Sequence, residues 1–166
     1  MSKFTIKAAT IDDVPLILTF IKKLAEYEKL AHMVTATEEG LREALFGARQ
    51  YVEIIIAYHE NQPAGFAVFS HNFSTFLGKP GLYVEDFFVD VEQRGKGLGK
   101  ALLAHMAKLA LERNCGRMEG AVEDWNAPSI KFYESIGAEP MNDLIYRLTG
   151  AALEKMANEF AVISNG

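Results

Sequence analysis

The chemistry of this sequence begins in the segment RGKGLGK, from Arg94 to Lys100, where glycines alternate with cationic or apolar residues. Glycine has no Cβ, so the backbone amides of such a segment can approach a ligand closely. An apolar-periodic run follows at once and predicts a helix, whose first amides have no acceptor within the helix. Amides and positive charges that converge in this way are typical of a binding site for a phosphate-bearing ligand.

Two well-known phosphate-binding loops do not fit this segment. The dinucleotide-binding fingerprint needs a third glycine where this chain has Lys100, and a Walker loop needs Ser or Thr where it has Ala101. A flexible loop with solvated lysines is the alternative interpretation of the same residues, because short glycine motifs match many unrelated loops. The glycines alone therefore indicate an anion site without naming its ligand.

An acidic pair, Glu85 and Asp86, lies inside the otherwise apolar run Tyr83–Val89. That run is dense in aromatic and β-branched residues and predicts a buried strand, on which alternation places the two carboxylates on opposite faces. A carboxylate in apolar surroundings tends to have its pKa raised, which suits a general base. The alternative is that both carboxylates only cap contacts at a sheet edge or between subunits.

Strands and helices along the whole chain must position these groups. The strand Tyr83–Val89 is followed by the glycine segment and by a helix from Leu98 to about Asn114. Further strands are expected at Phe4–Ala8, Tyr51–Tyr58, Ala64–Phe73, Gly116–Val122 and Leu144–Leu148, and further helices at Thr10–Lys29, Thr37–Gly47, Asn126–Ile136 and from Thr149 onward. Parallel neighbours need a helical crossover, so this order predicts an α/β (α+β) fold with a mixed, mainly antiparallel sheet of six to seven strands and helices on both faces.

Length and composition limit the class of protein. With 166 residues, of which 49% are hydrophobic and 23% charged, the chain is expected to form a single domain over residues 1–166. The net charge of −5, from 17 Lys and Arg against 22 Asp and Glu, argues against general nucleic-acid binding. No run approaches the roughly 20 apolar residues that cross a bilayer, so we expect a cytoplasmic protein without membrane contact.

Cysteine and histidine usage adds two expectations. Cys115 is the only cysteine, which excludes an internal disulfide and agrees with a reducing compartment. The four histidines show no metal-ligand spacing, and we predict no metal site.

Three segments together resemble the GNAT superfamily of N-acetyltransferases: VEDFFV, QRGKGLGKALL and, further downstream, WNAPSIKFYESIGA. The pyrophosphate-binding loop of that superfamily has the form Q/R-x-x-G-x-G/A, and Gln93, Arg94, Gly97 and Gly99 fill it. With KLAEYEKL near the N-terminus, the chain is similar to the spermidine/spermine (diamine) and thialysine N-acetyltransferase branch over nearly its whole length. The resemblance implies a GNAT-like fold and an acetyl-CoA-dependent transfer to a small cationic amine, a polyamine or a thialysine-like amino acid, by direct attack in a ternary complex.

Acetyl transfer from a thioester to an amine poses two proton problems. The amine arrives protonated with a pKa of about 10.4, so its neutral form at pH 7 costs about 4–5 kcal/mol and a base must help. The departing thiolate is better released as a thiol, so an acid must stand near the sulfur. Glu85 is the candidate base, and Tyr133, in the motif NAPSIKFY, is the candidate acid. Read without the resemblance, Tyr133 would be an ordinary core tyrosine.

The resemblance also implies which residues hold the two substrates. Tyr27 and Glu28, at the end of a predicted helix, would position the amine together with Glu85, although they could equally form a solvated helix end. The residues expected to bind acetyl-CoA are Phe87, Phe88, Val89, Arg94, Gly95, Lys96, Gly97, Leu98, Gly99, Lys100, Asn126 and Tyr133. The backbone at Phe87–Val89 would hold the thioester carbonyl, which requires a bulge or separated strands there.

Members of the branch form homodimers with active sites near the subunit interface, so we expect a homodimer. One departure concerns the substrate wall: members usually carry a tryptophan just before the arginine that matches Arg147, whereas this chain has Tyr146. A peptide or protein amino-group acetyltransferase and a non-catalytic acyl-CoA-binding regulatory domain remain as alternatives. The second of these has no need for Glu85 and Tyr133 together.

Overall fold

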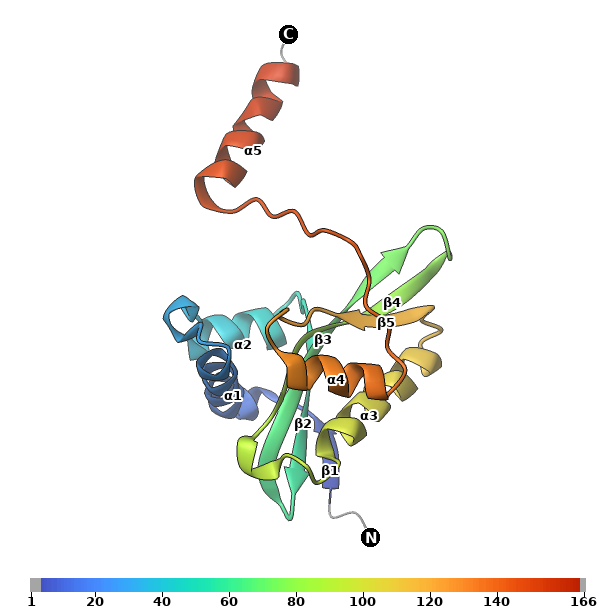
Figure 1. Cartoon of the computed structure of the whole chain (residues 1–166). Coiled ribbons are helices and arrows are strands. Elements are labelled where there is room, and N and C mark those ends of the chain that lie inside the picture. Colours follow the sequence, from blue (N-terminus) through green and yellow to red (C-terminus); the bar gives the residue numbers. More distant parts are fainter. Residues whose placement is uncertain (1–3, 165–166) are drawn as a thin grey trace. The chain divides into compact units, whose positions relative to one another are not determined.

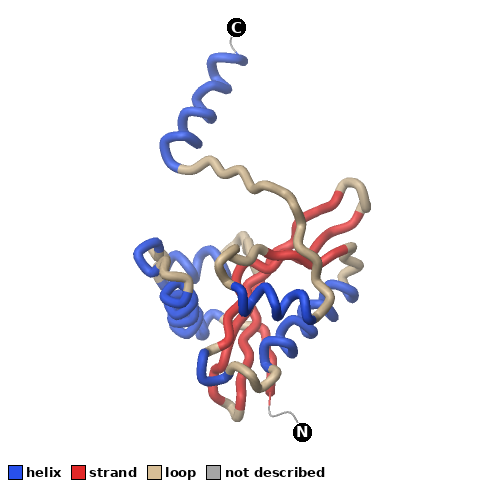
Figure 2. Tube along the Cα trace, in the orientation of Figure 1, coloured by secondary structure: helices blue, strands red, loops and turns tan. Residues whose placement is uncertain are grey.

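A five-stranded sheet with the strand order β1-β2-β3-β4-β5 forms the framework of the computed structural model, which describes residues 4–164 (Figures 1 and 2). The strands are β1 (Phe4–Ala8), β2 (Glu53–His59), β3 (Gln62–Ser74), β4 (Lys79–Val89) and β5 (Arg117–Gly120). The helices are α1 (Val14–Tyr27), α2 (Glu38–Phe46), α3 (Leu98–Glu112), α4 (Ala127–Ser135) and α5 (Gly150–Ser164). The chain divides into two compact units, Met1–Ala121 and Val122–Gly166.

Strands β1 to β4 pair antiparallel with their sequence neighbours, and β5 pairs in parallel with β4. The tight turn between β2 and β3 consists of Glu60 and Asn61, which both have positive φ, of 50° and 66°. Two such residues give the turn the twist that a two-residue hairpin needs. The parallel pair is connected through α3, as a parallel connection requires. The expected mixed, mainly antiparallel sheet is thereby confirmed.

Alternate residues of the central strands pack against different helices. One set forms a core with α1 and α2 that consists of Ile17, Phe20, Leu45, Ile54, Ile56, Phe66, Val68 and Phe88. Residues of the other parity, such as Ile55 and Phe69, lie beside His105 and Leu109 of α3. Since successive side chains of a strand point to opposite faces, α1 and α2 cover one face and α3 covers the other. The prediction of helices on both faces is confirmed.

Local sequence signals set the helix boundaries of the first unit. The Thr10 amide donates to Asp13 Oδ2 at 2.7 Å, the main-chain part of the predicted capping box ahead of α1. The Gly40 amide donates to Thr37 Oγ1 at 3.1 Å, so Thr37 is the N-cap of α2, as its position before the acidic first turn predicts.

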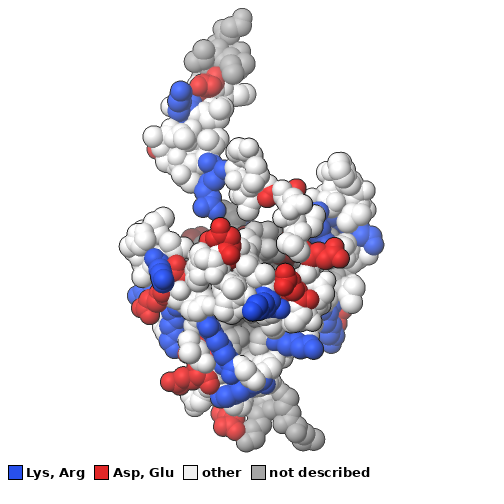
Figure 3. Space-filling view, in the orientation of Figure 1, with Lys and Arg blue, Asp and Glu red and all other residues white. Residues whose placement is uncertain are grey.

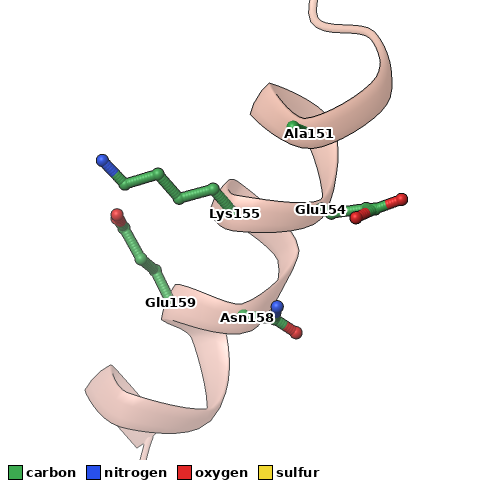
Figure 4. A pocket seen from close by; sticks show the side chains of 5 residues that line it. All are labelled: Ala151, Glu154, Lys155, Asn158 and Glu159. Atoms are coloured by element: carbon green, nitrogen blue, oxygen red, sulfur yellow. The ribbon is translucent and has the colours of Figure 1, made fainter.

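The second unit contains α4, α5 and the segment between them. The Ser129 amide donates to Asn126 Oδ1 at 3.3 Å, and Gly137, with φ of 87°, follows the end of α4, so both predicted boundary signals are confirmed. Figure 4 shows a hollow whose lining residues all belong to α5, so it is the surface of a single helix and not an enclosed site.

The strand expected at Leu144–Leu148 is wrong. Residues 138–149 contain neither helix nor strand, and the sheet formed by the described residues has five strands, not six or seven. A run of apolar and aromatic residues does not by itself make a strand, because a strand exists only where its backbone amides and carbonyls pair with a neighbour. None of the helices among residues 4–164 combines the length and the apolarity needed to span a bilayer.

Candidate active site

A β-bulge interrupts β4 within the predicted acidic pair. Val68 of β3 pairs with Asp86, and the next residue, Phe69, pairs with Val84, so Glu85 is the extra residue of the ladder. A bulge bends its strand and redirects side chains, and bulges are over-represented next to active sites. The strict alternation that predicted opposite faces for the two carboxylates therefore does not hold across Glu85 and Asp86.

The register of the sheet assigns Asp86 to one face. Directly paired residues of neighbouring strands point to the same side of a sheet. Asp86 pairs with Val68 and Phe88 pairs with Phe66, and both β3 residues belong to the core under α1 and α2. Asp86 therefore lies on the face that α1 and α2 cover, which we call the α1/α2 face.

The pKa of Asp86 is raised, first by burial of its side chain and second by the negative charge of Glu85. Both effects disfavour the ionised carboxylate, and a base with a raised pKa is better matched to neutral pH. The Glu85 side chain is exposed. The sequence marked the acidic pair but assigned the base to Glu85, and only the burial seen in the structure brings out Asp86.

The pairing of β4 with β5 ends just before the bulge. Their parallel pairing runs from Gly81 opposite Arg117 to Val84 opposite Gly120, whereas β4 continues to Val89. The stretch Glu85–Val89 thus extends beyond the part of β4 that pairs with β5. The separation of strands that the resemblance implies at Phe87–Val89 stays a prediction, because β5 ends at Gly120.

The glycine segment adopts a backbone that requires glycine. Gly95 and Gly97 have φ of 76° and 89°, and a Cβ added at either would meet no atom within 4 Å, so the requirement is conformational and not steric. Gly97 precedes α3, and the Ala101 amide donates to the Gly97 carbonyl at 3.0 Å. The amides of Leu98–Lys100 thus belong to the first turn, where no intrahelical acceptor exists. The predicted helix start at Leu98 is confirmed.

The Arg94 side chain connects this segment to α1 and β4. Its Nε donates to the Val89 carbonyl at 3.0 Å. Its guanidinium carbon lies 4.5 Å from the ring centroid of Tyr27 and 5.8 Å from that of Phe88, which is cation–π geometry. The structure therefore brings together Tyr27, predicted to position the amine, and Arg94, predicted to bind the cofactor.

Further side-chain contacts involve Asp90 and Gln93, which lie between β4 and the glycine segment. Gln93 Oε1 accepts from Lys96 Nζ at 3.0 Å and lies 2.8 Å from His59 Nδ1 on the β2–β3 hairpin. Lys23 of α1 forms an ion pair with Asp90, the residue after β4. Sequence reasoning gave His59 no role, because a lone histidine beside a turn carries no local signal.

Tyr27 and Glu28 lie at the end of α1. Tyr27 is the last residue of the helix, Glu28 is its C-cap, and both side chains are half-buried. They are therefore not a fully solvated helix end. Tyr27 reaches the guanidinium of Arg94, so at least this residue faces the β4 end of the unit.

Asn126 and Tyr133 belong to the second unit. The buried Asn126 caps α4 with its side chain, which gives it a structural role independent of any ligand. Tyr133 is half-buried near the end of α4, and burial raises the pKa of its phenol. A tyrosine with a raised pKa stays protonated at neutral pH and can donate its proton.

A polar group that the sequence analysis did not single out lies on β3 and β5. Glu119 Oε1 accepts from Asn72 Nδ2 at 2.7 Å and lies 3.2 Å from Arg117 Nη2. On the face seen in Figure 3, basic and acidic side chains are interspersed. The surface in view therefore carries charges of both signs, as the Arg117–Glu119 pair on β5 also does.

Comparisons with known proteins find acetyltransferases that are similar to this chain. The acetyltransferase (GNAT) family profile matches residues 21–138. An L-ornithine N5-acetyltransferase of Arabidopsis thaliana is 33% identical over 90% of this chain and 86% of its own length. A thialysine N-epsilon-acetyltransferase of Caenorhabditis elegans is 32% identical over 96% of this chain and its full length.

Solved structures share the fold. An integron cassette protein from the mobile metagenome of V. cholerae is 31% identical, with a TM-score of 0.79 over 95% of this chain and 98% of that one. An aminoglycoside acetyltransferase from an uncultured soil sample gives a TM-score of 0.73 at 18% identity over 89% of this chain and 97% of that one. The latter likeness concerns the fold alone.

Proposed function

The chain belongs to the acetyltransferase (GNAT) family and is an acyltransferase, and we propose that it moves the acetyl group of acetyl-CoA to a primary amine of a small cationic substrate by direct attack in a ternary complex. One observation carries this proposal. The strand that bears the bulged Glu85 and the half-buried Asp86 continues beyond its pairing with β5 and then leads into the glycine segment at the start of α3. The carboxylates proposed to bind the amine and the backbone amides proposed to bind a phosphate thus lie on one continuous segment, from β4 to the start of α3.

The glycine segment fits the pyrophosphate of the co-substrate. The positive φ of Gly95 and Gly97 turns the backbone toward the first-turn amides of α3, and open space lies beside both glycines. A helix N-terminus carries partial positive charge and stabilises an anion there. Lys96 and Lys100 add full positive charges. The Arg94 side chain contacts Val89, Tyr27 and Phe88 and so holds the glycine segment against β4 and α1.

The reaction forms one bond and breaks one. The neutral amine nitrogen attacks the thioester carbonyl carbon, the carbon–nitrogen bond forms, and the carbon–sulfur bond breaks. The proton that the ammonium group must lose first goes to a carboxylate of the β4 pair, directly or through water. Glu85 was predicted as this base, and Asp86 is a second candidate because burial raises its pKa. The sulfur receives its proton from the Tyr133 phenol, and the second proton, which the nitrogen loses as the amide forms, returns to the Tyr133 phenolate through water.

The relatives indicate the size of the acceptor. Thialysine and L-ornithine, named in the relatives' descriptions, are small and carry a side-chain amine. Tyr27 and Glu28 would position such an amine near the β4 carboxylates. Acetylation of a peptide or protein amino group is the second candidate, and a non-catalytic acyl-CoA-binding domain is the third. A single domain, a homodimer and a cytoplasmic location remain predictions.

A thiol-release assay with acetyl-CoA tests the proposal. The acceptor panel contains spermidine, spermine, putrescine, thialysine, L-ornithine, L-lysine, an aminoglycoside and a lysine-containing peptide. We expect selective turnover of a small diamine or basic amino acid, which disappears when Glu85 and Asp86 are both changed to the matching amides. Turnover of the peptide above all small amines would favour the second candidate. Binding of acetyl-CoA without turnover of any acceptor would favour the third.

A further inference from the structure

We infer that Arg117 and Glu119 of β5, with Asn72 of β3, recognise the α-carboxylate and α-ammonium groups of a basic α-amino acid, whose side-chain amine is the acetyl acceptor. This inference rests on the proposed acetyl transfer and names its substrate class. It separates basic amino acids from polyamines, which carry no carboxylate.

The sheet register aligns these three residues on the α1/α2 face. Asn72, Gly81 and Arg117 form one row across β3, β4 and β5, and Ser70, Tyr83 and Glu119 form the next row. Asn72 and Ser70 have the same parity on β3 as Val68, which belongs to the core under α1 and α2. Arg117, Glu119 and Asp86 therefore share one face of the sheet.

Gly81 allows the three side chains to come together. A Cβ at Gly81 would lie 2.3 Å from Asn72 Oδ1 and 3.2 Å from Arg117 Cγ, so any other residue would displace at least one of them. Within this space Glu119 Oε1 accepts from Asn72 Nδ2 at 2.7 Å and meets Arg117 Nη2 at 3.2 Å. The Glu119 side chain is thus held by Asn72 and Arg117 without any substrate.

The contacts among Asn72, Arg117 and Glu119 do not involve all of their polar side-chain atoms. Asn72 Oδ1 is buried and has no hydrogen-bond partner among residues 4–164. The side chains of Arg117 and Glu119 are 41% and 35% exposed, and they meet each other through Nη2 of Arg117 and Oε1 of Glu119. An exposed ion pair contributes little to stability, so stability alone gives weak reason for placing one here.

The charges of the group match an amino acid better than a polyamine. A guanidinium binds a carboxylate with two parallel hydrogen bonds, and a glutamate accepts from an ammonium group. The α-carbon of an amino acid carries one group of each kind. The distal ammonium of a diamine would instead meet the positive charge of Arg117, which opposes its binding.

The spacing along β4 fits the length of a basic side chain. Glu119 lies opposite Tyr83, and Glu85 follows two residues later, a distance of roughly 7 Å along the strand. Three or four carbon atoms separate the α-carbon of ornithine or lysine from the terminal nitrogen, a span of roughly 5–7 Å. An amino acid held at Arg117 and Glu119 can therefore present its amine to the β4 carboxylates.

Two pairs of acceptors that differ only in the carboxylate test this inference. They are L-ornithine with putrescine and L-lysine with cadaverine. We expect the wild-type protein to favour the amino acid of each pair. Arg117→Met should lower kcat/KM for L-ornithine on the order of 10- to 100-fold through KM, the effect of losing a charged hydrogen bond. Turnover of putrescine should stay unchanged or rise.

A variant at a second ion pair is the matched control. Lys108→Met removes the cation of the Lys108–Glu112 pair on α3 and should leave both acceptors unaffected. Arg117→Lys keeps the charge but loses the two-pronged geometry, so it should recover only part of the L-ornithine activity. A wild-type preference for putrescine, or an equal loss on both acceptors in Arg117→Met, would overturn the inference and leave acetyl transfer standing.

Calorimetry gives a readout that does not depend on turnover. L-ornithine and putrescine are titrated into the wild-type protein and into Arg117→Met, both checked for an unchanged Tm. Tighter binding of L-ornithine that disappears in the variant supports the inference even if no acceptor is acetylated, in which case only the proposed function fails. Equal binding of the two ligands to the wild-type protein counts against it.

Discussion

The guanidinium carbon of Arg94 lies 4.5 Å from the ring centroid of Tyr27, so the end of α1 contacts the first residue of the glycine segment. Arg94 also donates to the Val89 carbonyl at 3.0 Å. A single side chain thus connects the helix predicted to position the amine, the strand that carries the carboxylates and the segment predicted to bind pyrophosphate. We expect binding of the two substrates to be coupled through this contact.

A double-mutant cycle on Arg94 and Tyr27 measures the coupling. Arg94→Ala and Tyr27→Ala should each raise KM for acetyl-CoA, and the double variant should do so by less than the sum of the two free-energy changes. The expected coupling is about 0.5–1 kcal/mol, typical of a cation–π contact near the surface. Tyr27→Phe keeps the ring and should behave like the wild type in this assay. Strict additivity would show that the contact carries no coupling.

Substitution at Gly97 tests the conformational requirement. Because φ is 89° at this residue, Gly97→Ala should cost about 1–2 kcal/mol of folding free energy and weaken acetyl-CoA binding. Gly99 lies inside the first turn of α3, and its φ is not positive. Alanine favours a helix more than glycine does, so Gly99→Ala should leave Tm unchanged or higher. Thermal unfolding of both variants makes the comparison, and equal losses of Tm would contradict it.

Removal of the Tyr133 hydroxyl tests the acid. Tyr133→Phe should lower kcat on the order of 10²- to 10⁴-fold with little change in either KM, because the proton is needed only as the thiol leaves. Tyr51, an exposed tyrosine on the other unit, provides the control, and Tyr51→Phe should keep full activity. Steady-state kinetics with both variants decide the matter. Full turnover by Tyr133→Phe would exclude Tyr133 as the acid.

The half-buried Asp86 makes stability depend on pH in a defined direction. Its pKa in the folded protein lies above the unfolded value, so its contribution to stability is present below the unfolded pKa of about 3.9 and is lost as pH rises through the folded pKa. Asp86→Asn should therefore raise Tm at pH 7, and this gain should shrink toward pH 3. Tm measured across that range checks the sign. The substitution Asp12→Asn at an exposed position is the control for the Asp-to-Asn change itself.

Local signals in the sequence located most elements of the fold. The cap residues Thr37 and Asn126 and the glycines of RGKGLGK act on their immediate neighbours, so their effects could be predicted from a few adjacent residues. The bulge at Glu85 depends on the register between β3 and β4, which no local pattern contains. The group of Asn72, Arg117 and Glu119 escaped notice for the same reason, because pairing across three strands brings it together.

The error at Leu144–Leu148 has a related cause. Its apolar and aromatic residues predict a strand, but residue types alone supply no pairing partner. The structure gives this segment no strand, and Leu144, Ile145, Tyr146 and Leu148 are exposed. Hydrogen-bonded partners, not the pattern, decide whether a strand forms.

Because of the bulge, odd-numbered residues of β4 lie on the α1/α2 face before Glu85 and even-numbered residues lie on it after Glu85. Before Glu85 the odd-numbered Tyr83 belongs to the α1/α2 face, whereas after it the even-numbered Asp86 and Phe88 do. A strand of equal length without the extra residue, transplanted into this position, would keep its first half in place and turn its second half inside out. Phe88 would then leave the core, and any chimera between this chain and a relative must exchange the bulge together with the strand.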